Sequence, residues 1–221
     1  MDSDKLLNYT LAKRVTERLR EDILTRQIEV GERITIKDIA ERYGVSNMPV
    51  REAFRILEGE SLLEMNAYKG ATVKKLDKDF VCDVYGVLRA LECAMYETCL
   101  DTIPDEVLEE LRESNNEMRA VAREKVQPKL YNELNTNWHG VIISYCSNKL
   151  AEDRYKYYHQ LITSIRTSAY LTSYERIIQA TDEHDIILDA LHSRDVLKLK
   201  TAVDTHSIGA MNDLLKSYSG E

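Results

Sequence analysis

The chain has 221 residues, of which 43% are hydrophobic and 31% charged, so it holds enough apolar material for folded cores and does not match a disordered composition. Only 8 Gly and 3 Pro are present, which predicts few turns and a mainly α-helical fold. No apolar run approaches the roughly 18 residues that span a bilayer, and the start MDSDKLL lacks the basic and apolar regions of a signal peptide. We therefore expect a cytoplasmic protein with no membrane partner.

The first part of the chain reads as three short helices followed by two strands. Residues 10–28 place apolar side chains on one helical face, with Thr10 as the expected N-cap. A second helix is predicted over 36–43, and a third begins near Ser46, directly after the turn Gly44-Val45. Two short helices joined by a tight glycine-containing turn are typical of a helix-turn-helix. Residues 62–76 read as a β-hairpin, or wing, whose turn contains Gly70.

From Asp79 onward the apolar pattern is helical to the end of the chain. Six or seven helices are expected between residues 79 and 217, with Pro104 and Pro128 at helix starts. Their approximate spans are 79–100, 104–124, 128–146, 148–169, 174–193 and 195–217. We therefore predict two domains, a winged helix-turn-helix over 1–76 and an all-helical domain over 77–221.

The two parts also differ in charge. The whole chain carries −8, but residues 1–75 hold 14 basic and 13 acidic side chains, a balance of +1, so residues 76–221 carry −9. The acidic sum therefore does not exclude nucleic acid as a partner of the first part, because charge is distributed unevenly.

Residues 29–73 carry a dense set of short motifs. They are Gly31 with Arg33, Ala40, the turn Gly44-Val45-Ser46, the run Pro49-Val50-Arg51-Glu52-Ala53, Leu57-Glu58, and Gly70-Ala71 with Val73. Together they resemble the winged helix-turn-helix of the GntR superfamily of bacterial transcription regulators. The resemblance implies a domain that binds double-stranded DNA by placing its third helix in a major groove.

By this resemblance, DNA contacts fall on the third helix, the helix before it and the wing. The implied residues are Lys37, Ser46, Asn47, Met48, Arg51, Tyr68, Lys69 and Gly70. We expect Ser46 to cap the third helix and Arg51 to make the main specific contact, because Arg pairs bidentately with guanine. Many relatives have Arg where this chain has Asn47, so either the half-site differs or Asn47 contacts only the backbone. Arg33, Arg42 and Arg55 are interpreted as solvated or paired within the domain.

The second part resembles the FCD domain of the FadR-like branch of the same superfamily. The markers are VLRALECAMYE at 87–97, NTNWHGVIISYCSNKL, DEHDIILDALHSRD and AVDTHSIGAMNDLL. Many FCD domains bind a divalent metal through an Asp, a His one turn later, and two further histidines. The resemblance carries these positions to Asn135, His139, His184 and His206, a set that suits Zn²⁺, Ni²⁺ or Mn²⁺.

Asn135 departs from the Asp that the family commonly has, and a neutral amide oxygen is a weaker ligand than a carboxylate. The metal is therefore expected to bind less tightly or to be absent. His159 and His192 are interpreted as non-ligands. By the same resemblance, Arg89 either projects into the pocket and binds a carboxylate effector or pairs with Glu92 or Glu97. For Arg166 the same two alternatives, an effector contact or an ion pair within the domain, stay open. Many relatives sense organic acids, sugar acids or fatty-acyl derivatives.

The resulting hypothesis is a homodimeric transcription regulator, not an enzyme, that binds a pseudo-palindromic operator and a small organic-acid effector. One alternative is an architectural DNA-binding dimer with no effector. Another is a metal-dependent hydrolase built on the three histidines, with Asp182, Glu183 or Asp185 as general base.

Overall fold

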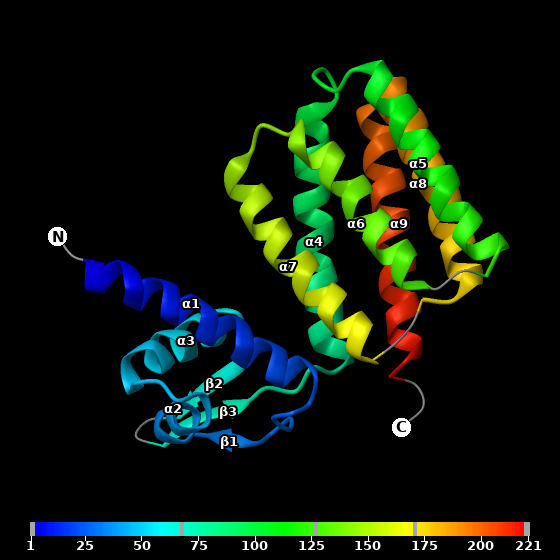
Figure 1. The fold of residues 1–221 in the computed structure, drawn as a ribbon. Coiled ribbons are helices and arrows are strands. Elements are labelled where there is room, and N and C mark those ends of the chain that lie inside the picture. Colours follow the sequence, from blue (N-terminus) through cyan, green and yellow to red (C-terminus); the bar gives the residue numbers. More distant parts are fainter. Residues whose placement is uncertain (1–2, 67–68, 126–127, 170–171, 219–221) are drawn as a thin grey trace. The chain divides into compact units, whose positions relative to one another are not determined.

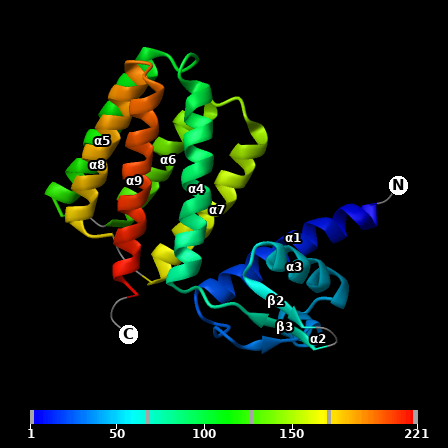
Figure 2. The same ribbon diagram turned by 180° about the vertical axis from the view of Figure 1, so that it is seen from behind.

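The computed structural model describes residues 3–66, 69–125, 128–169 and 172–218, and the chain divides into two compact units, residues 1–77 and 78–221. Nine helices and three strands lie within the described residues (Figures 1 and 2). None of those helices combines the length and the apolar character that a membrane crossing requires. The mainly α fold expected from the composition is confirmed.

The first unit combines three helices with a small sheet. Its elements are α1 (Ser3–Leu24), β1 (Arg33–Ile34), α2 (Ile36–Tyr43), α3 (Asn47–Gly59), β2 (Leu63–Asn66) and β3 (Gly70–Val73). The prediction for the start of α1 is wrong, because Thr10 lies inside the helix and does not cap it. Ile28 is fully buried although it lies beyond the helix end, where its N–H donates to the carbonyl oxygen of Asp22.

The helix-turn-helix of α2 and α3 is fixed at both ends of its first helix. The Thr35 hydroxyl accepts the N–H of Asp38 at 3.2 Å, and Gly44 ends α2 in the left-handed conformation, φ 65°. Ser46 stands at the N-cap of α3, but its side chain makes no capping hydrogen bond, contrary to the prediction. The predicted inner face of α3 is confirmed, because Val50, Ala53, Phe54 and Leu57 are buried.

The wing is part of a three-stranded antiparallel sheet with the order β1-β3-β2, and β1 was not predicted because two residues are too short to show a period. Gly70 has φ 87°, and a Cβ there would lie 2.2 Å from the carbonyl oxygen of Ile34. The close approach of the two strands therefore requires glycine at this position. Tyr68 lies outside the described residues.

Six helices lie in the part of the second unit that the structure describes, and each was predicted to within about two residues at each end. They are α4 (Lys78–Cys99), α5 (Asp105–Arg123), α6 (Pro128–Ser144), α7 (Lys149–Ala169), α8 (Tyr174–His192) and α9 (Val196–Lys216). Figures 1 and 2 show α5 and α8 side by side at one edge, α7 at the other, and α4, α6 and α9 between them. Helix α4 packs on α7 and α9, and α8 packs on α5 and α9.

The interior of this helical unit is not uniformly apolar. Trp138, Tyr96 and Met95 are among its fully buried large side chains, and several polar groups are buried beside them. The buried polar set includes Glu92, Asn115, His139, Arg176, His184, His206 and Asp213. Burial of polar groups is unfavourable unless they are paired, so a cluster of this size points to a functional site.

Candidate functional site

Three histidines from three helices converge inside the helical unit. His139 lies on α6, His184 on α8 and His206 on α9, and each is at most 6% exposed. Each ring offers one nitrogen, and these three atoms lie within 4.8 Å of one another. Three imidazole nitrogens at this spacing are a donor set for a divalent transition metal. The structure thus brings together the three histidines that the sequence singled out.

In each of the three rings, the Nδ1 atom already has a partner. His139 Nδ1 lies 3.1 Å from Glu92 Oε1 and 2.8 Å from Tyr96 Oη, His184 Nδ1 lies 3.0 Å from Asn115 Oδ1, and His206 Nδ1 lies 2.8 Å from Glu183 Oε2. A hydrogen bond at one ring nitrogen fixes the tautomer and the orientation that present the other nitrogen to a metal. The Nε2 atom of His184 is buried and has no hydrogen-bond partner among the described residues.

The ring of Trp138 packs against the rings of His184 and His139. Its ring stacks on that of His184 with centroids 4.1 Å apart, and it meets the ring of His139 edge-on at 5.0 Å. The indole is itself fixed, because its N–H donates to the carbonyl oxygen of Leu111 at 3.1 Å. Trp138 was not predicted as a site residue, although its place directly before His139 in the sequence was a signal.

Asn135 offers a candidate fourth donor in the cavity that His139 and His206 line. It precedes His139 by one turn of α6 and lines the same cavity. Its Oδ1 atom is buried and makes no hydrogen bond among the described residues. A buried amide oxygen without a partner is unfavourable, and a cation would satisfy it. The residues present therefore fit a divalent metal, with three imidazole nitrogens and one neutral amide oxygen.

Two of the clustered histidines, His184 and His206, have a lowered pKa, which favours the neutral form that metal binding requires. Burial lowers the pKa of His184 well below its ordinary value, and the nearby His206 and His139 lower it further. Burial also lowers the pKa of His206, although the hydrogen bond with Glu183 acts in the opposite direction. Burial raises the pKa of Glu92, but its hydrogen bonds with His139 and Ser207 and its electrostatic interactions with His139 and His206 together lower the pKa to about 2. Glu92 is therefore a carboxylate at neutral pH.

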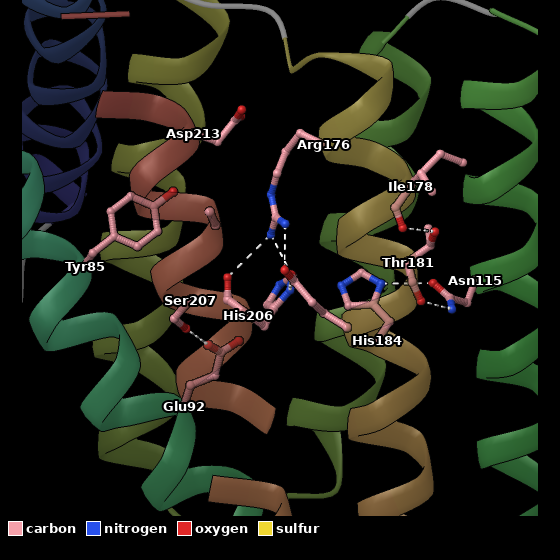
Figure 3. A network of polar contacts seen from close by, with 12 residues as sticks. Tyr85, Glu92, Asn115, Arg176, Ile178, Thr181, His184, His206, Ser207 and Asp213 are labelled. Atoms are coloured by element: carbon pink, nitrogen blue, oxygen red, sulfur yellow. Dashed lines mark hydrogen bonds and ion pairs between the residues drawn. The ribbon is translucent and has the colours of Figure 1, made fainter. Parts of the chain in front are cut away.

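A cavity of about 90 Å³ adjoins the histidines, and Arg176 and Arg166 both line it. Figure 3 shows Arg176 projecting from α8 toward His206 on α9, while His184 faces Asn115. The guanidinium of Arg176 donates to both carboxylate oxygens of Glu183, at 2.7 and 2.6 Å. Glu183 thus links a cavity arginine to His206, since one of its oxygens also contacts His206 Nδ1.

Arg166 enters the cavity from α7 and is held by several partners. It lies 3.4 Å from Asp213 Oδ2, and it donates to the Tyr85 hydroxyl and to the carbonyl oxygen of Ala210. Burial would lower its pKa, but Tyr85 and Asp213 raise it, so the guanidinium stays charged. Both cavity arginines carry anion-binding potential next to the histidine cluster.

The prediction that Arg89 projects into the pocket is wrong. Its side chain is 42% exposed, pairs with Asp204 at 3.4 Å, and does not line the cavity. The helical turn places position 89 on the outer side of α4, whereas Leu88 and Glu92 face inward. The sequence motif alone identified the helix correctly but assigned the inward position to the wrong residue.

The other two histidines lie apart from the cluster. His159 lines the cavity with its ring 6.2 Å from that of His139, and His192 is exposed, 3.7 Å from Asp105. The carboxylates considered as general bases are all paired with other side chains. Asp182 and Asp185 both pair with Arg119, and Glu183 pairs with Arg176 and His206.

In the first unit, the side chains assigned to DNA contact lie on the surface. Lys37, Ser46, Asn47, Met48, Arg51 and Lys69 are exposed, and Gly70 is half-buried. Arg51 makes no hydrogen bond or ion pair with any residue that the structure describes. The three arginines that were interpreted as solvated or paired have partners within the unit: Arg33 donates to the Lys69 carbonyl at 2.6 Å, Arg42 lies 3.2 Å from Asp22, and Arg55 lies 3.7 Å from Glu52.

Comparison with known proteins gives the same two parts. The family model for bacterial regulatory proteins of the gntR family matches residues 11–73, and that for the FCD domain matches residues 83–208. The chain is 26% identical over 190 residues to the HTH-type transcriptional repressor RspR of Escherichia coli K12, covering 85% of this chain and 82% of that protein. It is 25% identical over 209 residues to a probable D-xylose utilization operon transcriptional repressor of Paenarthrobacter nicotinovorans, covering 94% and 90%.

Solved structures share the fold. E. coli McbR/YncC matches with a TM-score of 0.63 at 17% identity, over 94% of this chain and 98% of that one. A putative GntR regulator from Rhodococcus sp. RHA1 matches with a TM-score of 0.60 at 20% identity, over the same shares of the two chains. The relatives are regulators, so the hydrolase hypothesis is not supported. The chain belongs to the gntR family of bacterial regulatory proteins, carries an FCD domain, and is a DNA-binding transcription regulator.

Proposed function

We propose that the protein is a homodimeric repressor whose affinity for a pseudo-palindromic operator changes when a small carboxylate binds the cavity of the helical unit. The observation that carries this proposal is the junction of the three-histidine cluster with a cavity lined by Arg166 and Arg176, on a chain that also bears the winged helix-turn-helix. The named relatives of similar length are repressors, which supports the sign of regulation.

The DNA contacts are assigned to the exposed start of α3 and to the wing. Arg51 is free to read a base edge, and Asn47 and Met48 lie beside it in the first turn. The hydroxyl of Ser46, which makes no capping hydrogen bond, and the ammonium of Lys69 are assigned to phosphate contacts, and Gly70 belongs to the same set by family resemblance. Lys37 and Tyr68 complete the set implied by the family.

The metal would be held by Asn135, His139, His184 and His206, with Zn²⁺, Ni²⁺ or Mn²⁺ as candidates. A bound divalent ion would act as a Lewis acid that orients an anionic ligand, with no catalytic step. The chain's own residues support this role, because Glu92, Asn115 and Glu183 fix the rings through Nδ1.

The effector would occupy the cavity beside the histidines, where its carboxylate meets Arg176 or Arg166. A volume of about 90 Å³ admits a small organic acid and excludes a fatty-acyl chain unless the cavity opens. Binding shifts the operator-competent population only through a difference in effector affinity between the free and the DNA-bound state.

Selection from a random duplex pool tests this function. The purified protein is incubated with the pool, with and without a metal chelator, and the retained duplexes are sequenced. An inverted repeat in the retained fraction is expected, together with an altered enrichment after chelation. Binding without any sequence enrichment, sensitive only to salt, would argue against a specific dimeric regulator. An inverted repeat that no chelator or small carboxylate affects would favour an architectural role.

A further inference from the structure

The four candidate metal donors, of which Asn135, His139 and His206 line the cavity, carry no formal charge when they bind an ion. A histidine that binds a metal through a ring nitrogen is neutral, so His139, His184 and His206 bring no charge to an ion, and Asn135 presents an amide oxygen. A divalent ion bound by these donors alone keeps its two positive charges, because none of its protein ligands is negatively charged. In a buried site such charge is costly unless an anion lies next to it.

The charged side chains around the cavity only partly compensate for such an ion. Those that line it, or pair directly with one that does, are the carboxylates of Glu92, Glu183 and Asp213 and the guanidiniums of Arg166 and Arg176. Three carboxylates against two guanidiniums leave one negative charge in excess. Lys216 also approaches Asp213, at 3.8 Å, but its ammonium is exposed and screened by solvent.

The sign of the cavity therefore depends on the metal. When these carboxylates and guanidiniums alone are counted, the excess negative charge opposes entry of an anion in the absence of an ion. With a divalent ion, the same set carries one positive charge in excess, which one monocarboxylate neutralises. The two oxygen atoms of a carboxylate can also occupy the coordination positions of the ion that the four neutral protein donors leave open.

We propose that a divalent metal and a monocarboxylate bind this cavity cooperatively, because Asn135 and the three histidines give the ion no negative charge and leave that role to the effector. This inference rests on the metal and effector site proposed above and adds a coupling between the two ligands. By linkage, the carboxylate raises the affinity for the metal by the same factor by which the metal raises the affinity for the carboxylate. The chain would then respond to the two ligands jointly.

Replacing Asn135 with Asp tests the origin of the coupling. The substitution preserves the size of the side chain and adds one negative charge to the donor set. Asn135→Asp is expected to bind Zn²⁺ at least about tenfold more tightly than the native chain without any carboxylate, as typical coupling factors indicate. The effect of a carboxylate on this variant should fall below about threefold, because the missing charge is already present. Asn137→Asp, on the exposed side of α6, is the matched control and should behave as the native chain.

The measurement is competition for Zn²⁺ between the metal-free protein and a chromophoric chelator. It is made without additive, with saturating acetate, and with acetamide as the neutral counterpart of acetate. Acetate is expected to lower the Kd for Zn²⁺ by about tenfold or more, and acetamide to leave it unchanged. This comparison uses the native chain, so it tests the coupling between metal and carboxylate even if the Asn135→Asp variant fails to fold.

Each outcome separates the coupling from the function it rests on. If Zn²⁺ binds with the same Kd in acetate, acetamide and plain buffer, the coupling is refuted while the metal site stands. If Zn²⁺ binds under none of these conditions, both the metal site and the coupling are refuted, whereas selection of an inverted repeat from the duplex pool would still support the regulator. An equal response of Asn135→Asp and the native chain to acetate would refute the assigned role of Asn135.

Discussion

Arg51 differs from its neighbours in having an unengaged guanidinium. Arg33 and Arg42 bind partners within the winged unit, and Arg55 pairs with Glu52 one turn away on the same helix. An arginine that is exposed in the first turn of a recognition helix and has no partner in the described chain keeps its full hydrogen-bonding capacity for DNA. The contrast between Arg51 and Arg55 therefore provides a matched pair for mutation.

Arg51→Ala is expected to weaken binding to the selected operator by about 1–3 kcal/mol per half-site and to reduce sequence discrimination, because a bidentate base contact is lost. Arg55→Ala on the same helix serves as the control and should change affinity much less. Binding curves on operator and scrambled duplexes, with thermal unfolding to confirm the fold, measure the effect. Unchanged operator affinity in Arg51→Ala would refute the assignment.

His184 is the most enclosed of the three clustered histidines, fixed by Asn115 at Nδ1 and by the stacked ring of Trp138. His184→Ala is expected to remove bound metal, since two imidazoles and an amide form a weak site. Elemental analysis of purified protein, with the exposed His192→Ala as the control, gives the answer. A variant that retained the metal content of the native protein would exclude His184 as a ligand.

At the scale of elements, the sequence predicted what local periodicity and turn residues determine. The six helices of the second unit were placed correctly, because Pro104, Pro128 and the apolar spacing mark them. The start of α1 was misplaced, because Thr is a common N-cap residue, whereas the helix already begins at Ser3. Strand β1 could not be predicted either, because its two residues form a strand only by pairing with β3, far along the chain.

The wing offers a test of this pairing. Gly70→Ala is expected to destabilise the winged unit by more than about 1 kcal/mol and to weaken DNA binding, because the new methyl group combines a positive φ with a clash against the Ile34 carbonyl. Gly31→Ala is the control: it has a similar φ of 79° but nothing within 4 Å of the added Cβ. Thermal unfolding of both variants separates the clash from the backbone strain. Equal destabilisation would mean that the clash is relieved.

At the scale of the whole molecule, the site shows the limits of sequence reasoning. The three clustered histidines and Asn135 could be singled out because a family resemblance marks them. The side chains that hold the histidine rings in place could not be predicted. Asn115, for example, is 69 residues from His184 and pairs with it only because α5 packs on α8. Arg176 carried no motif, and its position in the cavity follows from the turn of α8 and from Glu183.

Acid sensitivity is a second property of the folded unit as a whole. The pKa of His159 is lowered to about 4, chiefly by burial and then by His139, whereas an unfolded histidine titrates near about 6.5. As the pH falls from about 6.5 toward 4, the unfolded state takes up a proton that the folded state does not, so the free energy of unfolding decreases by about 2–3 kcal/mol for this group. Above pH 7 the contribution is constant.

Denaturant unfolding of metal-free protein between pH 7 and pH 5 measures this decrease. His159→Gln, which retains a polar side chain of similar reach without a titrating ring, is expected to show a shallower slope than the native chain. Glu92 does not obscure the comparison, because its pKa of about 2 places its own loss of stability at lower pH. Identical slopes for the two proteins would rule out His159 as a source of the acid sensitivity.

The stacking of Trp138 on His184 has a spectroscopic consequence. The chain contains a single tryptophan, and its ring lies 4.1 Å from an imidazole of the histidine cluster. Its intrinsic fluorescence therefore comes from one known place in the helical unit, with no emission from a second indole to subtract. An ion that draws electron density from the His184 ring would alter the emission intensity of its neighbour. The protein thus carries a built-in optical reporter, which permits stopped-flow measurement of how fast this site fills and empties in unlabelled, native protein.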